Sequence, residues 1–134
     1  MRVNRAVTDD AHLPFSIATD VGGGTSFSML RTLGAAYETA QLKGQSLSPV
    51  RAFYLATLGA ARCLALEGRI GHFFPGAEAD FIALSLRATP LLARRMERAR
   101  TLSEILLLLM TLGDDRAIAR TYVLGRCVHG DVAA

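Results

Sequence analysis

Asp20 is the residue of this chain best placed to do chemistry. It follows a short β-prone run, Phe15 to Thr19, and precedes three glycines, Gly22 to Gly24. An acidic side chain at the carboxyl end of a strand, before a turn into a helix, faces the active-site mouth in α/β barrels. Position alone leaves two interpretations open. The carboxylate binds a metal ion and shuttles a proton, or it only caps the turn or the next helix.

The histidines are poorly spaced for a metal site. His12, His72 and His129 lie far apart, and no two of them follow the HxH or HExxH pattern of zinc sites. We therefore expect each histidine at the surface or in a loop, and no zinc site formed by this sequence alone. The glycine turn lacks the lysine of a P-loop, so it is only a weak indication of phosphate binding.

The composition is that of a folded globular domain. The chain has 134 residues, of which 51% are hydrophobic and 20% charged, enough for one core and unlike a disordered protein. The formal net charge is +3. The densest basic run falls on a predicted helix, where such residues usually form a solvated face; it comprises Arg94, Arg95, Arg98 and Arg100. We expect no nucleic-acid partner.

The unpaired spacing of the cysteines and the short length of the apolar runs favour a cytoplasmic protein. Cys63 and Cys127 are far apart and form no CxxC motif, which argues against a disulfide scaffold and fits a reducing compartment. The longest apolar run, Ile105 to Met110, is far shorter than the roughly 20 residues that span a membrane. The N-terminus has no apolar region of a signal peptide. We expect a cytoplasmic protein with no membrane partner.

The first half of the chain predicts one strand and two helices. Residues 14–19 alternate as a short β-strand. Thr25 and Ser26 are good N-caps for a helix that runs to about Lys43 and ends at Gly44. Ser48 followed by Pro49 is typical of a second helix start, and the apolar pattern continues to about Leu66.

The second half predicts strands around two helices. Pro75-Gly76 indicates a turn, and residues 79–86 are expected to form a strand. Residues 90–100 are expected to be helical. Thr101 with Glu104 forms a capping-box pattern that opens a helix over 102–112, with Gly113 just after its end. Residues 120–128 are expected to be a strand pair turning at Gly125. The lone strand at 14–19 has no evident partner.

A long stretch of the chain resembles the guanine deaminases of the amidohydrolase superfamily. The similarity is most specific in TDVGGGTSFSMLRT, residues 19–32, which is similar to the last barrel strand and the following helix of those enzymes. It continues through AAYETAQLKGQSLSP, RAFYLATLGAARCL, GRIGHFFPGAEADFIAL, RATPLLARR and LMTLGDDRAIARTYVLGR. These motifs cover about residues 15–126.

The resemblance implies an α/β fold: the C-terminal part of a distorted (β/α)₈ barrel with part of a small β-sandwich, mostly helical here with a few short strands. The expected division begins with an unmatched segment, 1–13. The last barrel strand with its helices, 14–68, follows, and then sandwich strands, 69–89, a helical segment, 90–116, and C-terminal sandwich strands with a tail, 117–134. Since a whole barrel takes roughly 250 residues and this chain has 134, we expect a truncated segment.

The resemblance also implies chemistry. In the family, one zinc ion is held by an HxH pair, another histidine and an aspartate, and Asp20 corresponds to that aspartate, as metal ligand and catalytic residue. The substrate is guanine, which is hydrolysed to xanthine and ammonia. One carboxylate alone binds zinc weakly, so we expect this chain by itself to be inactive.

Two other interpretations stay open. In the first, the chain is a non-catalytic interaction module that self-associates or pairs with the barrel segments it lacks. In the second, the parent is another deaminating amidohydrolase that acts on a different heterocycle.

Overall fold

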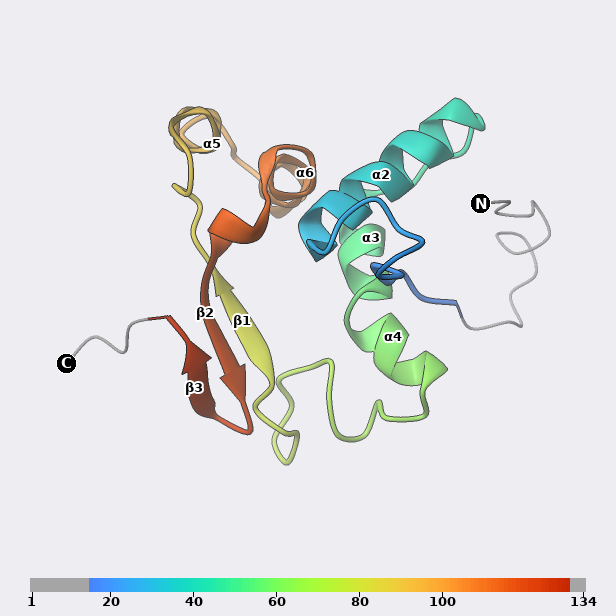
Figure 1. The fold of residues 1–134 in the computed structure, drawn as a ribbon, viewed down its shortest axis with the longest axis vertical. Helices are drawn as coiled ribbons and strands as arrows, with labels where there is room; N and C mark the ends of the chain where they lie inside the picture. Colours follow the sequence, from blue (N-terminus) through green and yellow to red (C-terminus); the bar gives the residue numbers. More distant parts are fainter. Residues whose placement is uncertain (1–14, 131–134) are drawn as a thin grey trace.

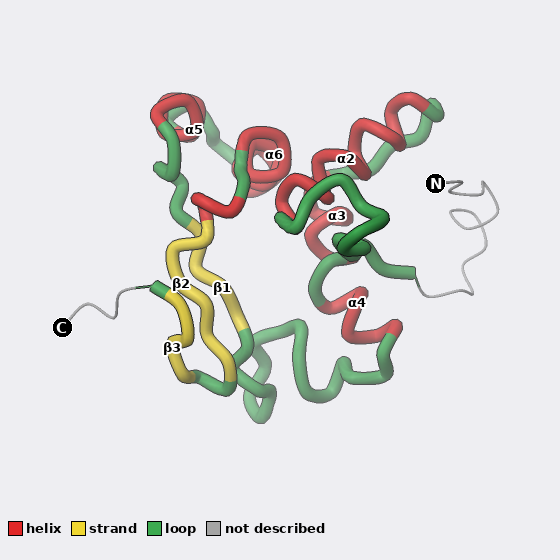
Figure 2. The backbone as a smooth tube through the Cα atoms, viewed as in Figure 1, coloured by secondary structure: helices red, strands yellow, loops and turns green. Residues whose placement is uncertain are grey.

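The chain folds into a group of helices beside a small antiparallel sheet (Figures 1 and 2). The computed structural model describes residues 15–130. The helices are α2 (Met29–Leu42), α3 (Pro49–Leu55), α4 (Leu58–Cys63), α5 (Pro90–Met96) and α6 (Leu102–Leu112), with a short 3₁₀ helix at Asp115–Ala117. The strands are β1 (Phe81–Leu84), β2 (Ile118–Val123) and β3 (Arg126–His129). The expectation of a mostly helical fold with a few short strands is confirmed.

The strand expected at 14–19 does not form in the described part of the chain. Residues 15–20 carry no regular secondary structure. They contact α3 through a hydrogen bond from the Ile17 N–H to the Leu55 carbonyl, 3.2 Å long, and through the Arg51 guanidinium, which lies 5.8 Å from the centre of the Phe15 ring. A β-strand is stabilised by its ladder partners, and residues 15–130 place no strand beside this segment. The Ile17 side chain instead packs against the helical core.

Helix α2 starts later than its sequence predicts. The N-cap is Ser28, not Thr25 or Ser26, because the Ser26 hydroxyl accepts a hydrogen bond from the Ser28 N–H in the turn before the helix. The expected end is confirmed: Gly44 has a φ of +67° directly after the C-cap residue, a conformation that glycine adopts without strain.

The helix expected from Pro49 to Leu66 is two helices, α3 and α4. Its start is confirmed, since the Ser48 hydroxyl accepts a hydrogen bond from the Arg51 N–H. The break falls at Thr57, whose φ of −127° and ψ of −104° are not helical. The Thr57 hydroxyl donates to the Phe53 carbonyl at 2.8 Å. Thr39 makes the same bond within the unbroken helix α2, so this bond alone does not end α3.

Helix α6 is the centre of the helical group and contacts α2, α3 and α5. Its predicted capping box is present: the Thr101 hydroxyl accepts from the Glu104 N–H, and the Glu104 carboxylate accepts from the Thr101 N–H. Its buried residues join two core clusters, Leu109 with Leu30 and Ala117, and Met110 with Leu33 and Ala52. Apolar burial therefore joins helices that lie far apart in sequence.

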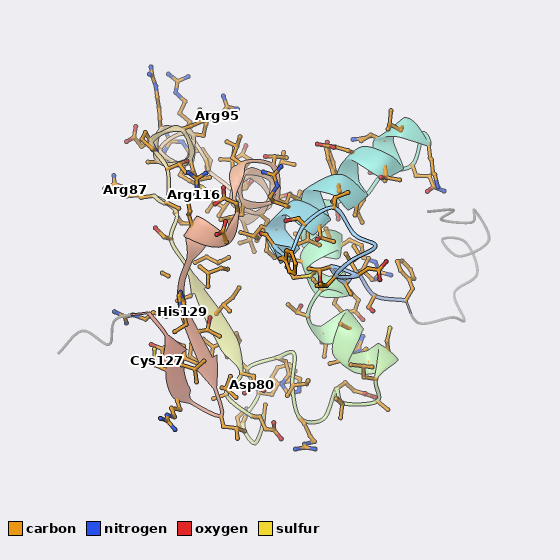
Figure 3. The ribbon with its side chains drawn as sticks, viewed as in Figure 1. Asp80, Arg87, Arg95, Arg116, Cys127 and His129 are labelled. Carbon is orange, nitrogen blue, oxygen red and sulfur yellow. The ribbon has the colours of Figure 1, made fainter. Side chains whose placement is uncertain are left out.

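The sheet has the order β1-β2-β3, with both pairs antiparallel. The strand pair expected around Gly125 is confirmed, and its two-residue turn has positive φ at both Leu124 (50°) and Gly125 (77°), as in a type I′ turn. The segment before β1 fastens this turn: Asp80 Oδ1 accepts from the Leu124 N–H at 2.7 Å, and the Ala79 carbonyl accepts from the Gly125 N–H (Figure 3). Within residues 15–130, no helix is long and apolar enough to cross a membrane.

Candidate functional site

Asp20 opens a tight turn between the extended N-terminal segment and α2. The N–H groups of Gly23 and Gly24 both donate to the Asp20 carbonyl, at 2.9 and 2.5 Å. Asp20 itself has a φ of +48°. Few residues other than glycine adopt this left-handed conformation, and aspartate is among those that tolerate it best. The turn therefore fixes the backbone from which the carboxylate projects.

The three glycines are needed for different reasons. Gly22 has a φ of +99°, which an L side chain rarely tolerates. A Cβ on Gly24 would overlap the Thr19 carbonyl oxygen, and one on Gly23 would stand 2.8 Å from Asp20 Oδ2. The backbone of the turn thus explains Gly22 and Gly24, and the Asp20 carboxylate explains Gly23, with no need of a bound phosphate.

The Asp20 carboxylate is exposed and unpaired among the residues that the structure describes. Asp20 is solvent-exposed, and within residues 15–130 its side chain makes no hydrogen bond or ion pair. The cap of α2 is Ser28, without a side-chain cap bond. The turn-capping interpretation of this carboxylate therefore has no hydrogen bond to support it in this structure.

No second metal ligand joins Asp20 in the described part of the chain. Residues 15–130 contain no group of three or more His, Cys, Asp and Glu side chains close enough to hold a metal ion. His72 is occupied in its own loop: Nδ1 accepts from the Phe74 N–H at 3.1 Å, so Nε2 carries the proton and donates to the Glu67 carbonyl at 2.7 Å. His129 is exposed on β3, and His12 lies outside the described residues.

Two carboxyl groups with a lowered pKa serve the fold. Hydrogen bonds from the backbone N–H groups of Arg100 and Thr101 hold the pKa of Glu104 below its usual value. The Arg116 guanidinium, 2.6 Å from Asp114 Oδ2, lowers the pKa of Asp114. The first group caps α6 and the second caps the 3₁₀ helix. Neither lies in the Asp20 turn.

The basic run lies on the surface. Its four arginines are exposed on α5 and on the turn that follows it, and Figure 3 shows Arg95 projecting away from the helical group. Exposure is what the solvated-face interpretation expects.

A cavity of about 400 Å³ lies elsewhere, between the loop at 71–73 and the sheet. Its aromatic residues are Phe73, Phe81 and Tyr122, and the Phe81 and Tyr122 rings stack with their centroids 4.4 Å apart. Sequence reasoning did not find this cluster, because Tyr122 on β2 lies far along the chain from Phe73 and Phe81. No residue of the Asp20 turn lines it.

Comparisons with known proteins agree with one another. A model described as the amidohydrolase family matches residues 1–128. Guanine deaminase of Escherichia coli (strain K12) is 52% identical over 113 residues, which cover 84% of this chain and 26% of that protein. A probable guanine deaminase of Deinococcus radiodurans is 40% identical over 116 residues, with the same shares covered.

Solved structures give the same result. The E. coli guanine deaminase structure matches with a TM-score of 0.85 and 50% identity, covering 89% of this chain and 28% of that one. A guanine deaminase from Bradyrhizobium japonicum matches with a TM-score of 0.80 and 31% identity, covering 96% and 34%. The chain thus spans about a quarter of the length of the curated relatives it matches.

Proposed function

The chain belongs to the amidohydrolase family, and we propose that it is the C-terminal segment of a guanine deaminase whose complete form hydrolyses guanine to xanthine and ammonia. The observation that carries this proposal is the 52% identity over 113 residues to the E. coli guanine deaminase, together with a TM-score of 0.85 to its structure. The same observation weighs against a deaminase for another heterocycle.

Zinc is the metal that the family implies, and the described residues fit it in part. Asp20 offers an exposed carboxylate with no partner among residues 15–130, and carboxylate oxygen is a normal zinc ligand. The same residues contain no group of three or more candidate ligands, whereas a zinc site needs three or four. The remaining ligands would come from other parts of the complete enzyme.

We assign Asp20 two tasks in that enzyme. Its carboxylate would bind the metal, which when bound supplies Lewis acidity and lowers the pKa of a water ligand towards about 7. An Asp20 oxygen would accept the proton of the attacking water and then deliver it to the amino nitrogen that leaves guanine. An exposed, unpaired carboxylate on a rigid turn is suited to both tasks.

The test is a chimera in which residues 15–130 replace the matching segment of the E. coli guanine deaminase. We expect the chimera to convert guanine to xanthine, and Asp20→Asn to lower kcat by about 10²–10⁴-fold, because an amide can touch zinc but cannot accept the proton. Asp115→Asn, at another exposed carboxylate, is the matched control and should leave the rate unchanged. The 134-residue chain alone, with zinc added, should show no turnover.

Two results would contradict the assignment. A near-normal rate for Asp20→Asn in an active chimera would remove Asp20 from the mechanism. Zinc-dependent turnover by the isolated chain, above that of a metal-stripped sample, would show that this segment carries a complete site.

The alternative function is a non-catalytic module that pairs with another chain. Residues 15–20 favour it, because among the described residues their backbone has a single hydrogen bond outside the turn and is available for strand pairing. An inactive but well-folded chimera would support this alternative.

A further inference from the structure

Gly23 lies directly against the Asp20 carboxylate. A Cβ built on Gly23 would stand 2.8 Å from Asp20 Oδ2, 3.4 Å from Cγ and 3.7 Å from Oδ1, and real Cβ atoms essentially never approach another atom within 3.0 Å. The carboxylate therefore occupies space that exists only because residue 23 has no side chain.

An added methyl group at position 23 would move the carboxylate and leave the turn in place. The colliding atom is the free end of the Asp20 side chain, which makes no hydrogen bond within the described residues and turns about χ1 and χ2 at low cost. The backbone, by contrast, is held by two hydrogen bonds to the Asp20 carbonyl. Gly23 has no positive φ either, so alanine fits its backbone conformation.

The two neighbouring glycines differ from Gly23 in this respect. A Cβ on Gly24 would meet the Thr19 and Asp20 backbone, so a side chain there would break the turn. A Cβ on Gly22 would meet nothing within 4 Å, and the constraint there is the φ of +99°. Of the three glycines, Gly23 is therefore the one at which an added side chain would change the direction of the Asp20 carboxylate.

We propose that Gly23 is a positioning residue for Asp20: its bare Cα lets the carboxylate lie over the turn in the orientation used for metal binding and proton transfer. This inference rests on the proposed function, because it gives that orientation a catalytic purpose. Groups that orient a metal ligand through hydrogen bonds change metal affinity or activity by about 10–100-fold when altered, and we expect a steric change in ligand orientation to act on the same scale. A carboxylate displaced by about 1 Å has a comparable effect on rate.

The decisive variant is Gly23→Ala in the active chimera, with Gly68→Ala as the matched control. A Cβ on Gly68 would meet nothing within 4 Å, and Gly68 has no positive φ, so the control makes the same substitution without touching Asp20. For Gly23→Ala we expect zinc affinity, measured by chelator competition, to fall about 10–100-fold. We expect kcat to fall similarly while KM for guanine stays near wild type, and Gly68→Ala to change neither zinc affinity nor kcat.

A second measurement separates this inference from the proposed function. In the isotopically labelled 134-residue chain, the Hα–Hβ couplings of Asp20 report its χ1 angle, and Gly23→Ala should change them while amide shifts outside the turn stay fixed. Unchanged couplings, or an active chimera in which Gly23→Ala keeps wild-type zinc affinity and kcat, would overturn the inference. If Gly23→Ala changes the couplings but the chimera without this substitution has no activity, the positioning of the carboxylate is supported and the proposed function is refuted.

Discussion

The sharpest stability prediction concerns Leu33, on α2. Its side chain is 1% exposed and packs with Ala52 of α3 and Met110 of α6, so it joins three helices. Leu33→Ala removes three buried carbon atoms from a junction that α2, α3 and α6 hold from separate sides. Leu→Ala changes at such sites cost about 2.7–5.0 kcal/mol, and the high end applies where neighbours cannot collapse into the cavity. We expect about 3–4 kcal/mol here.

The control for this prediction lies on the same helix. Leu42 is 89% exposed, so Leu42→Ala makes the same chemical change at a position that is not buried. It should change the free energy of unfolding by no more than about 0.5 kcal/mol. Urea unfolding followed by circular dichroism, at one low protein concentration, measures both. With a slope near 2 kcal/mol/M, typical of small proteins, Leu33→Ala should lower the midpoint by about 1.5–2 M. Equal midpoints for the two variants would refute the assignment of Leu33 to the core.

Self-association, stability in acid and hydrogen exchange test three other features of the structure. The isolated chain should self-associate, because residues 15–20 leave backbone groups unpaired within the described part and large apolar side chains such as Phe27 are exposed (83%); a monomer in light scattering at micromolar concentration would contradict this. The pKa of Glu104 is lowered in the folded state, so its contribution is present above its unfolded pKa and lost as pH falls through the folded pKa; the stability gap between wild type and Glu104→Gln should therefore close in acid, and a gap independent of pH would count against the capping box. Asp80→Ala removes the acceptor of the Leu124 N–H and should speed hydrogen exchange of that amide, with an unchanged exchange rate as the contrary result.

Local features were predictable from the sequence because they depend on residues close together in the chain. The Ser48 cap, the capping box of Thr101 with Glu104, and the turn at Gly125 are all present. Each involves atoms within a few residues of one another, so the side-chain types and their spacing determine the hydrogen bonds. The family resemblance was equally readable, because it rests on long motifs of consecutive residues.

Tertiary structure decided the features that need distant partners. The β-prone residues 15–19 stay without a ladder, since β pairing requires a neighbouring strand and the described residues provide none there. The helix expected over 49–66 breaks at Thr57, whose backbone leaves the helical conformation, although the apolar pattern of the sequence continues through this position.

The candidate site likewise has one part that the sequence predicted and another that only the structure shows. The sequence placed Asp20 before a glycine turn and so made it the candidate carboxylate. Only the folded turn shows that this carboxylate is free of capping bonds and lies over Gly23. The direction of the Asp20 carboxylate depends on the φ of Asp20 and on the two hydrogen bonds that close the turn. The types of the residues in the sequence specify neither of these.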